Sequence, residues 1–256
     1  MKMITIIPVP AFTDNYIWML INNGYAVSVD PGDANITINW LEHTGLKLCA
    51  VLNTHHHKDH TGGNARLREL YRIPIYGPAK DPIPTLTHSL VDGDTLTIDE
   101  IGISLRIMEI PGHTLGHIGY IGENFVLCGD TLFSAGCGRI FEGNPSMMLN
   151  SLDKLAHLPA STQVYCTHEY TLSNLRFAKH IEPENLKLRQ FDMNAINLRK
   201  QNLPTLPSTI EIERNINPFL RCCIANVALA AKKLYGANPD DIISVFSALR
   251  EAKNNF

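Results

Sequence analysis

Short apolar runs alternate with amphipathic segments along the first two thirds of the chain. Runs of five to eight mostly apolar residues, bounded by polar or turn-forming residues, are typical of strands in a sheet. Segments with apolar positions three and four apart are typical of helices, and they occur at residues 34–44, 64–72 and 145–157. The predicted strands are residues 3–9, 16–22, 25–30, 48–54, 73–77, 94–98, 103–110, 117–122, 124–130 and 163–167.

The last third has a different pattern. Helical periodicity occupies residues 172–182, 185–201, 225–235 and 239–253, and almost no strand signal remains. Strands mixed with helices, followed by helices alone, indicate an α/β domain and then a helical one. We therefore predict an α/β domain over residues 1–171 and an all-helical domain over residues 172–256.

Composition and charge exclude several classes of protein. The formal net charge is -3, so the chain has no overall attraction for nucleic acid or for an anionic membrane. No apolar run approaches the roughly 20 residues of a membrane span, and the first residues lack the features of a signal peptide. The six cysteines form no C-x-x-C pair, which indicates reduced thiols in a reducing compartment. We predict a cytoplasmic protein.

Residues 54–63 read THHHKDHTGG and place four histidines and one aspartate between His55 and His60. Neutral imidazole is the commonest protein ligand for transition metals. The cluster is also not isolated, because three further apolar runs end at His113, Asp130 and His168. In α/β sheets, ligands bind beyond the carboxyl ends of strands, so these four endings are expected to converge.

Counting donors gives seven potential metal ligands: His55, His57, Asp59, His60, His113, Asp130 and His168. One zinc ion prefers four ligands, and a catalytic zinc takes only three from protein. Seven donors suit two ions that share a carboxylate and a water molecule. His55, His57 and His113 could hold one ion and Asp59, His60 and His168 the other, with Asp130 between them.

Other residues near the cluster have less certain roles. His56 points away from its neighbours if the segment is extended, so we do not include it among the ligands. His117 either orients a ligand or simply packs. Asp30, in VDPGD, either accepts a hydrogen bond from a ligand imidazole or caps a turn.

Two metal ions indicate hydrolysis by a bridging hydroxide. A bound ion lowers the pKa of water from about 15.7 towards about 7, so no serine or cysteine nucleophile is needed. Two divalent ions, Asp59, Asp130 and a hydroxide leave a site charge of about +1, which attracts anionic substrates. No general acid is evident beside the cluster. This favours a thioester, since a thiolate can leave unprotonated, but a lactone, a β-lactam or a phosphodiester remains open.

The motifs THHHKDH, PGHTLGH, CGD, CTHEY and DPGD together resemble the metallo-β-lactamase superfamily. Within it, the chain is similar over its whole length to the glyoxalase II family of hydroxyacylglutathione hydrolases. The more specific stretches are AFTDNYIW, LFSAGCGRIFEG, HEYTLSNLRFA, NPFLR and ALREAKNNF.

This resemblance implies a four-layer αβ/βα sandwich with a C-terminal all-helical domain that binds glutathione. It implies hydrolysis of S-D-lactoylglutathione to glutathione and D-lactate, the second step of methylglyoxal detoxification. The family's metal ligands fall on the seven donors named above. Asp59 and Asp130 are the expected catalytic residues, and the metal-bridging hydroxide is the expected nucleophile.

Glutathione contacts are also implied by the resemblance. Arg139 stands where the family places a basic residue near the glycine carboxylate, and Phe141 stands where some members have tyrosine. Tyr170 matches a tyrosine that contacts the tripeptide, while Arg250 and Lys253 match a basic pair on the last helix. An arginine grips a carboxylate with two donors, whereas a lysine acts as a point charge.

Three alternatives differ in what they would bind. A persulfide dioxygenase would use one iron ion and leave several donors spare, and an RNA-processing nuclease would need an extended basic surface. A non-enzymatic metal module would need fewer donors. For a hydrolase, zinc is the expected metal, and iron and manganese also accept this ligand set. We predict a monomer that acts on a small glutathione thioester and binds neither nucleic acid nor membrane.

Overall fold

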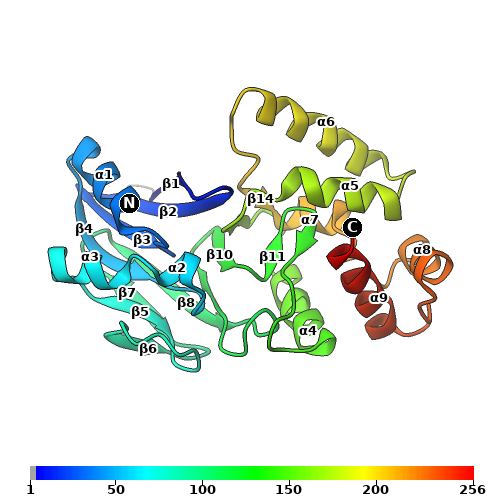
Figure 1. Cartoon of the computed structure of the whole chain (residues 1–256), viewed down its shortest axis with the longest axis horizontal. Coiled ribbons are helices and arrows are strands. Elements are labelled where there is room, and N and C mark those ends of the chain that lie inside the picture. Colours follow the sequence, from blue (N-terminus) through cyan, green and yellow to red (C-terminus); the bar gives the residue numbers. More distant parts are fainter. Residues whose placement is uncertain (1–3) are drawn as a thin grey trace. The chain divides into compact units, whose positions relative to one another are not determined.

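The computed structural model describes residues 4–256 and divides into two compact units (Figure 1). Unit 1 contains the chain up to Glu109 together with Thr114–Gly129, and unit 2 contains Ile110–His113 and Asp130–Phe256. The first predicted strand begins at Met3, which lies outside the described residues. The predicted domain boundary between residues 171 and 172 falls inside unit 2 and stays a prediction.

The first sheet of unit 1 has six strands in the order β1-β2-β3-β4-β5-β6. The first three strands are antiparallel, and β3 to β6 run parallel. Their side chains are mostly buried in the central strands, which explains the long apolar runs in the sequence. The strands are β1 Thr5–Ala11, β2 Asn15–Asn22, β3 Tyr25–Val29, β4 Lys47–Leu52, β5 Ile75–Pro78 and β6 His88–Leu90.

Helices α1 (Ala34–Thr44) and α3 (Asn64–Tyr71) pack on this sheet, and the four-residue helix α2 (Lys58–Thr61) precedes α3. The buried face of α1 supplies Leu41 to a core cluster that also contains Val51 and Leu67. Helix α1 begins at the Asp33 cap, whose side chain accepts a hydrogen bond from Asn35 N, and it ends at Gly45 in the left-handed conformation.

The second sheet of unit 1 is antiparallel and contains β10, β9, β8 and β7 in that order. It faces the first sheet, because the buried Tyr120 hydroxyl of β9 donates to Asn53 O at the end of β4. Asn22 of β2 likewise donates to Ile101 O. The strands are β7 Thr95–Ile98, β8 Ile103–Glu109, β9 Ile118–Ile121 and β10 Phe125–Gly129.

Unit 2 is largely helical. Its strands form two small antiparallel pairs, the β11–β12 hairpin and β13 with β14. Its core includes a cluster in which Ala135 of the hairpin packs against residues of α5, α6 and α7. The elements are β11 Leu132–Phe133, β12 Gly136–Cys137, α4 Pro145–Ala156, β13 Gln163–Cys166, α5 Thr171–Ile181, α6 Leu186–Lys200, β14 Ser208–Thr209, α7 Ile210–Ile216, α8 Ala225–Tyr235 and α9 Ile242–Asn254.

The structure confirms the predicted α/β fold with a helical C-terminal region. Helix α9 begins later than predicted, at Ile242, because the Asp241 side chain caps it by accepting from Ile243 N. The sequence pattern missed β6, β11, β12, β14, α2 and α7, which have seven residues or fewer. None of the described helices is long and apolar enough to cross a membrane.

Candidate metal centre and substrate cavity

Four of the predicted ligands lie in unit 1, in the segment between β4 and α2 and in α2 itself. We call His55, His57, Asp59 and His60 the first ligand set. His55 and His60 are fully buried, and the Asp59 side chain is 42% exposed. The buried strand β4 is therefore followed by a polar segment whose histidine rings are largely shielded from solvent.

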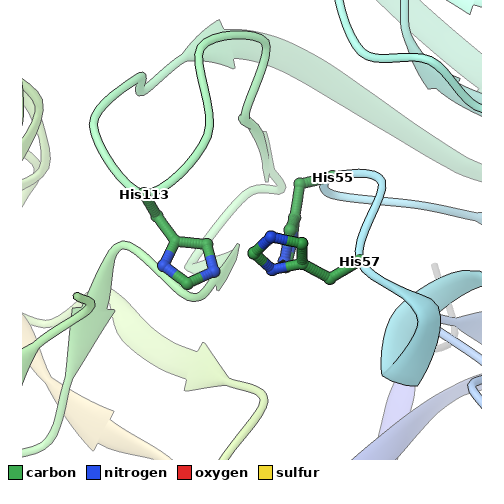
Figure 2. A group of neighbouring side chains, drawn as sticks. All are labelled: His55, His57 and His113. Atoms are coloured by element: carbon green, nitrogen blue, oxygen red, sulfur yellow. Dashed lines mark hydrogen bonds between the residues drawn. The ribbon is translucent and has the colours of Figure 1, made fainter. Parts of the chain in front are cut away.

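The rings of His55 and His57 lie edge to face, with an interplanar angle of 80° and with His55 Nε2 only 3.0 Å from His57 Nδ1 (Figure 2). The other nitrogen of His55, Nδ1, lies 3.0 Å from the Thr54 hydroxyl. Thr54 is itself fixed by Asp30, which accepts from both its backbone N–H and its hydroxyl. The ring of His117 stacks on His55 at a centroid distance of 4.7 Å.

Asp30 also supports His60. Its Oδ2 lies 3.0 Å from His60 Nδ1, while His60 Nε2 lies 3.4 Å from Asp59 Oδ2. Asn15 of β2 donates to the same Asp59 oxygen at 3.0 Å. Asp30 thus joins Thr54 and His60, and it has a left-handed backbone with φ of 52°. Such strain in a residue other than glycine is sustained where surrounding contacts fix the conformation.

His56 turns towards Asp81 instead of joining the other rings of the cluster. The buried Asp81 carboxylate accepts from His56 N and lies 3.0 Å from His56 Nδ1. It also accepts from the Thr114 hydroxyl at 3.0 Å and from Gly116 N at 2.8 Å. One carboxylate therefore ties the loop of the first ligand set to the loop that follows His113.

The remaining three predicted ligands lie in unit 2, and we call His113, Asp130 and His168 the second ligand set. Asp130 Oδ2 lies 3.4 Å from His113 Nε2 and 3.3 Å from His168 Nε2. His113, which Figure 2 shows on the loop after β8, has its Nδ1 at 2.8 Å from Arg139 O. Since a carbonyl oxygen only accepts hydrogen bonds, Nδ1 of His113 carries the proton and donates a hydrogen bond to Arg139 O. Nε2 then has a lone pair that can bind a metal ion.

Both sets have the chemistry of metal ligands. A ligand histidine usually holds its second ring nitrogen against a carboxylate, a carbonyl or a hydroxyl group, which fixes the tautomer. His55, His60 and His113 each meet such a partner through Nδ1. The nitrogens of His55 and His57 are separated by about the spacing of two ligands on one ion. Groups of histidine and aspartate that could hold a metal ion are thus present in the described chain.

Gly129 immediately precedes Asp130 and shows why the CGD motif contains glycine. Its φ is 49°, in the left-handed region that favours glycine. A Cβ atom here would collide with the Thr54 hydroxyl and would lie 2.7 Å from His117 Nε2. Glycine therefore allows β10 to end close to the support of the first ligand set.

A cavity of about 390 Å³ lies in unit 2. Its wall contains all five predicted substrate contacts and two residues of the second ligand set. The other four lining residues are not among the predicted site residues. The full lining is His113, Asp130, Phe133, Cys137, Arg139, Phe141, Tyr170, Ser173, Asn174, Arg250 and Lys253.

Basic side chains give the cavity an anion-attracting wall. Burial lowers the pKa of the half-buried Lys253, and the neighbouring cations Arg250, Arg176 and Arg139 lower it further. The Lys253 ammonium donates to the Ser173 hydroxyl at 3.3 Å. An incoming carboxylate would relieve the repulsion among these cations, so the wall is suited to an anionic ligand.

Arg250 is 6% exposed and is more constrained than a surface arginine. Its Nη1 donates to Cys137 O at 2.6 Å, its Nη2 donates to Asn254, and the guanidinium lies 5.1 Å from the Phe219 ring centroid. Nε is buried without a hydrogen-bond partner among the described residues. Arg250 therefore supports the cavity wall as well as lining it.

The aromatic residues lie next to the second ligand set. The Tyr170 ring stacks on His168 with an interplanar angle of 3°, and Phe141 meets His113 edge to face. Phe141 is 63% exposed and Tyr170 37%. Large exposed aromatic faces beside a cavity are available for ligand contact.

Two family models together match nearly the whole chain. One, described as Metallo-beta-lactamase superfamily, matches residues 12–168, and the other, described as Hydroxyacylglutathione hydrolase C-terminus, matches residues 169–256. The chain is 50% identical to a hydroxyacylglutathione hydrolase of Nitrosomonas europaea over 99% of its own length and 97% of that relative. It is 48% identical to one of Vibrio parahaemolyticus over 99% and 100% of the two chains.

Solved structures share the fold. A B3 metallo-beta-lactamase, BLEG-1, has a TM-score of 0.63 at 27% identity and covers 85% of this chain and 99% of its own. ETHE1 from Myxococcus xanthus has a TM-score of 0.66 over 96% and 90% of the two chains. Its identity is only 21%, so this likeness shows the fold alone.

We predict that the Asp81→Ala variant binds metal about tenfold or more weakly, because Asp81 fixes the loop of the first ligand set through His56 and the loop after His113 through Thr114 and Gly116. Groups that support metal ligands typically have effects of about this size. Metal content after dialysis against a mild chelator, measured by mass spectrometry, checks this. Leu90→Ala, a buried change in the neighbouring strand β6, is the control and should lower the melting temperature without releasing metal. An Asp81→Ala protein with wild-type metal affinity would show that Asp81 does not support the metal centre.

Proposed function

The chain belongs to the hydroxyacylglutathione hydrolase family of the metallo-beta-lactamase superfamily, and we propose that it hydrolyses S-D-lactoylglutathione to glutathione and D-lactate. The observation that carries this proposal is the cavity of unit 2. Its wall combines His113 and Asp130 with three basic side chains, Arg139, Arg250 and Lys253. That combination suits a substrate with a reactive acyl group and a carboxylate at a distance from it.

The family relatives support thioester hydrolysis over the alternatives considered from the sequence. ETHE1 resembles this chain at the level of the fold only. The names of the relatives match the expected glutathione thioester, which is a small molecule.

The proposed cofactor is a pair of divalent ions, with zinc as the expected metal and iron or manganese as alternatives. The first and second ligand sets would hold them, with His55, His57 and His113 on one ion, Asp59, His60 and His168 on the other, and Asp130 shared. Bound there, the ions would polarise a carbonyl and lower the pKa of water towards about 7. Asp59, held by Asn15, would keep its carboxylate oriented towards this centre.

The basic wall would bind the glycine carboxylate of the tripeptide. The Lys253 ammonium provides a point charge beside the Ser173 hydroxyl, and Arg139 adds positive charge at the exposed side of the cavity. Arg250 would contribute through the donors that its contacts with Cys137 and Asn254 leave over. Fixing this remote carboxylate would orient the thioester carbonyl for attack.

Tyr170 and Phe141 would contact the tripeptide through their exposed rings. Tyr170 also offers a hydroxyl, whereas Phe141 has none and would contribute only apolar contact. The leaving group is a thiolate, which needs no proton donor in the wall because its conjugate acid has a pKa of about 8.5. The residues of the cavity thus have to bind and orient the substrate and need not act as acids.

We also propose that the protein acts as a monomer in the cytoplasm, without nucleic-acid or membrane partners. The net charge of -3 supports the absence of nucleic-acid and membrane partners. The six cysteines, all of which are free thiols, support a reducing compartment. Five of the six are at least partly shielded, while Cys223 is exposed.

Replacing a ligand should remove most of the activity. We expect His57→Ala and Asp130→Ala to lower kcat for S-D-lactoylglutathione at least about a hundredfold, because each removes a donor from the proposed ions. Hydrolysis followed by the loss of thioester absorbance, with and without a chelator, measures this. The matched control is His43→Ala, an exposed histidine of α1, which should keep wild-type kcat and metal content. Wild-type turnover by either ligand variant would overturn the ligand assignment.

Lys253 and Arg250 should differ when each is replaced by alanine. Lys253→Ala should raise KM about tenfold or more with little change in kcat, since a charge-assisted contact to the substrate is lost. Arg250→Ala should raise KM, lower kcat and lower the melting temperature, because it also releases the Cys137 carbonyl. Steady-state kinetics with a thermal melt of each variant separates the two. Unchanged kinetics for Lys253→Ala would mean that Lys253 does not bind the substrate.

The lowered pKa of Lys253 gives a pH test. Binding of an anion needs the ammonium form, which persists below this pKa and is lost as the pH rises through it. KM of the wild type should therefore begin to rise at a lower pH than it would if Lys253 had the ordinary pKa of a lysine. Lys253→Arg stays charged and should keep a flat KM over that range, whereas Lys233→Arg on α8 should follow the wild type. Identical pH profiles for wild type and Lys253→Arg would exclude Lys253 from anion binding.

A further inference from the structure

The β11–β12 hairpin forms part of the cavity wall. Its two strands pair with each other through only two residue pairs. Its two strands have two residues each, and they are joined through Ser134 and Ala135, the latter with φ of 55°. An isolated hairpin is marginally stable even when it is much longer. Other parts of unit 2 must therefore hold this one in place.

Side chains from α5, from α9 and from the residue that follows α7 meet the main chain of the hairpin. Asn217 Nδ2, just after α7, donates to Phe133 O at 3.1 Å and to Gly136 O at 2.9 Å. Asn174 of α5 donates to Ser134 O at 3.0 Å, and Arg250 of α9 donates to Cys137 O. Four carbonyls between residues 133 and 137 thus accept hydrogen bonds from side chains. In a larger sheet, the N–H groups of a neighbouring strand would donate such bonds.

Glu213 of α7 supplies the complementary acceptor. Its Oε2 accepts from Ala135 N at 2.8 Å and from Asn217 Nδ2 at 3.0 Å, and the side chain is completely buried. Burial raises the pKa of Glu213, while hydrogen bonds from Ser208, Ala135, Asn217 and Ser134 act in the opposite direction. Because Asn217 binds both the carboxyl group and the hairpin, Glu213 and Asn217 form one network.

The hairpin connects this network to the proposed chemistry. Phe133 and Cys137 line the cavity. Along the chain, the hairpin follows the proposed ligand Asp130 and precedes the cavity residue Arg139. Gly138 N donates to Thr131 O and closes the base of the hairpin. Arg139 O in turn meets Nδ1 of the ligand His113. A shift of the hairpin would therefore move both the wall and the support of a ligand.

We propose that Glu213 and Asn217 are positioning residues, which set the substrate affinity of the cavity by fixing the β11–β12 hairpin. This inference rests on the proposed function, since it assumes that the cavity binds the glutathione thioester. Glu213 does not touch the substrate in this account. It acts through the Ala135 amide and through the Asn217 side chain.

The alternative is that Glu213 merely stabilises unit 2. Glu213→Ala removes the acceptor of a buried N–H group and should lower stability in either case. Ile210→Ala is the matched control, because Ile210 is a fully buried residue of the same helix outside the Ala135 cluster. It should lower the melting temperature and leave KM unchanged. Glu213→Gln keeps an acceptor for Ala135 N and should restore wild-type KM.

The experiment measures KM, kcat and melting temperature for metal-loaded wild type, Glu213→Ala, Glu213→Gln, Asn217→Ala and Ile210→Ala. We expect KM to rise about tenfold in Glu213→Ala and Asn217→Ala, because a wall displaced by a fraction of an ångström misplaces the bound substrate. Glu213→Asp, which withdraws the acceptor by one methylene, replaces Glu213→Ala if that variant does not fold. KM values equal to that of Ile210→Ala would overturn the inference.

Calorimetric titration of the same proteins with glutathione measures binding without hydrolysis. It therefore tests the positioning role of Glu213 separately from the proposed function. If wild type fails to hydrolyse the thioester, the proposed function fails, and glutathione affinity becomes the test of the hairpin. Weaker glutathione binding by Glu213→Ala than by Ile210→Ala supports positioning by Glu213. Equal binding by these two variants contradicts it.

Discussion

The proposed chemistry depends first on histidine rings whose second nitrogen is held by a neighbour. His55 meets the Thr54 hydroxyl, His60 meets Asp30, and His113 donates to Arg139 O. Each contact fixes the ring and directs Nε2 away from that support, as a metal ligand requires. Asp30 has a special place, because it binds both Thr54 and His60 and sustains a left-handed backbone to do so.

In unit 2, basic side chains line a cavity whose wall also contains the proposed ligands His113 and Asp130. Lys253 lies among Arg250, Arg176 and Arg139, and burial and mutual repulsion lower its pKa. A carboxylate would complete this arrangement, whereas a neutral ligand would leave the repulsion in place. Arg250 supports the cavity wall, since the carbonyl of Cys137 takes up part of its hydrogen-bonding capacity, and in the proposed function it also binds the substrate. The proposed function therefore couples substrate recognition to wall stability at this residue.

The sequence predicted the fold class and the main strands because buried strands leave continuous apolar runs. It also brought out the seven ligand candidates, since each follows such a run or lies in THHHKDH. It also offered Asp30 as a possible acceptor for a ligand imidazole, and Asp30 does lie against His60. It did not reveal the supporting roles of Asp81 and Glu213. Asp81 lies 25 positions from His56, and Glu213 lies 78 positions from Ala135, so no local pattern links the partners. The β11–β12 hairpin was missed for a related reason, because side chains distant in sequence stabilise it and its strands have two residues each.

The central claim is that this chain uses two bound ions to hydrolyse a glutathione thioester. The most direct measurement is a titration of the metal-free protein with zinc, with the rate of S-D-lactoylglutathione hydrolysis recorded at each addition. The account predicts that activity rises until about two equivalents per chain are bound and then stays constant, as expected for a binuclear site. Full activity without metal, or no activity with both equivalents bound, would contradict it.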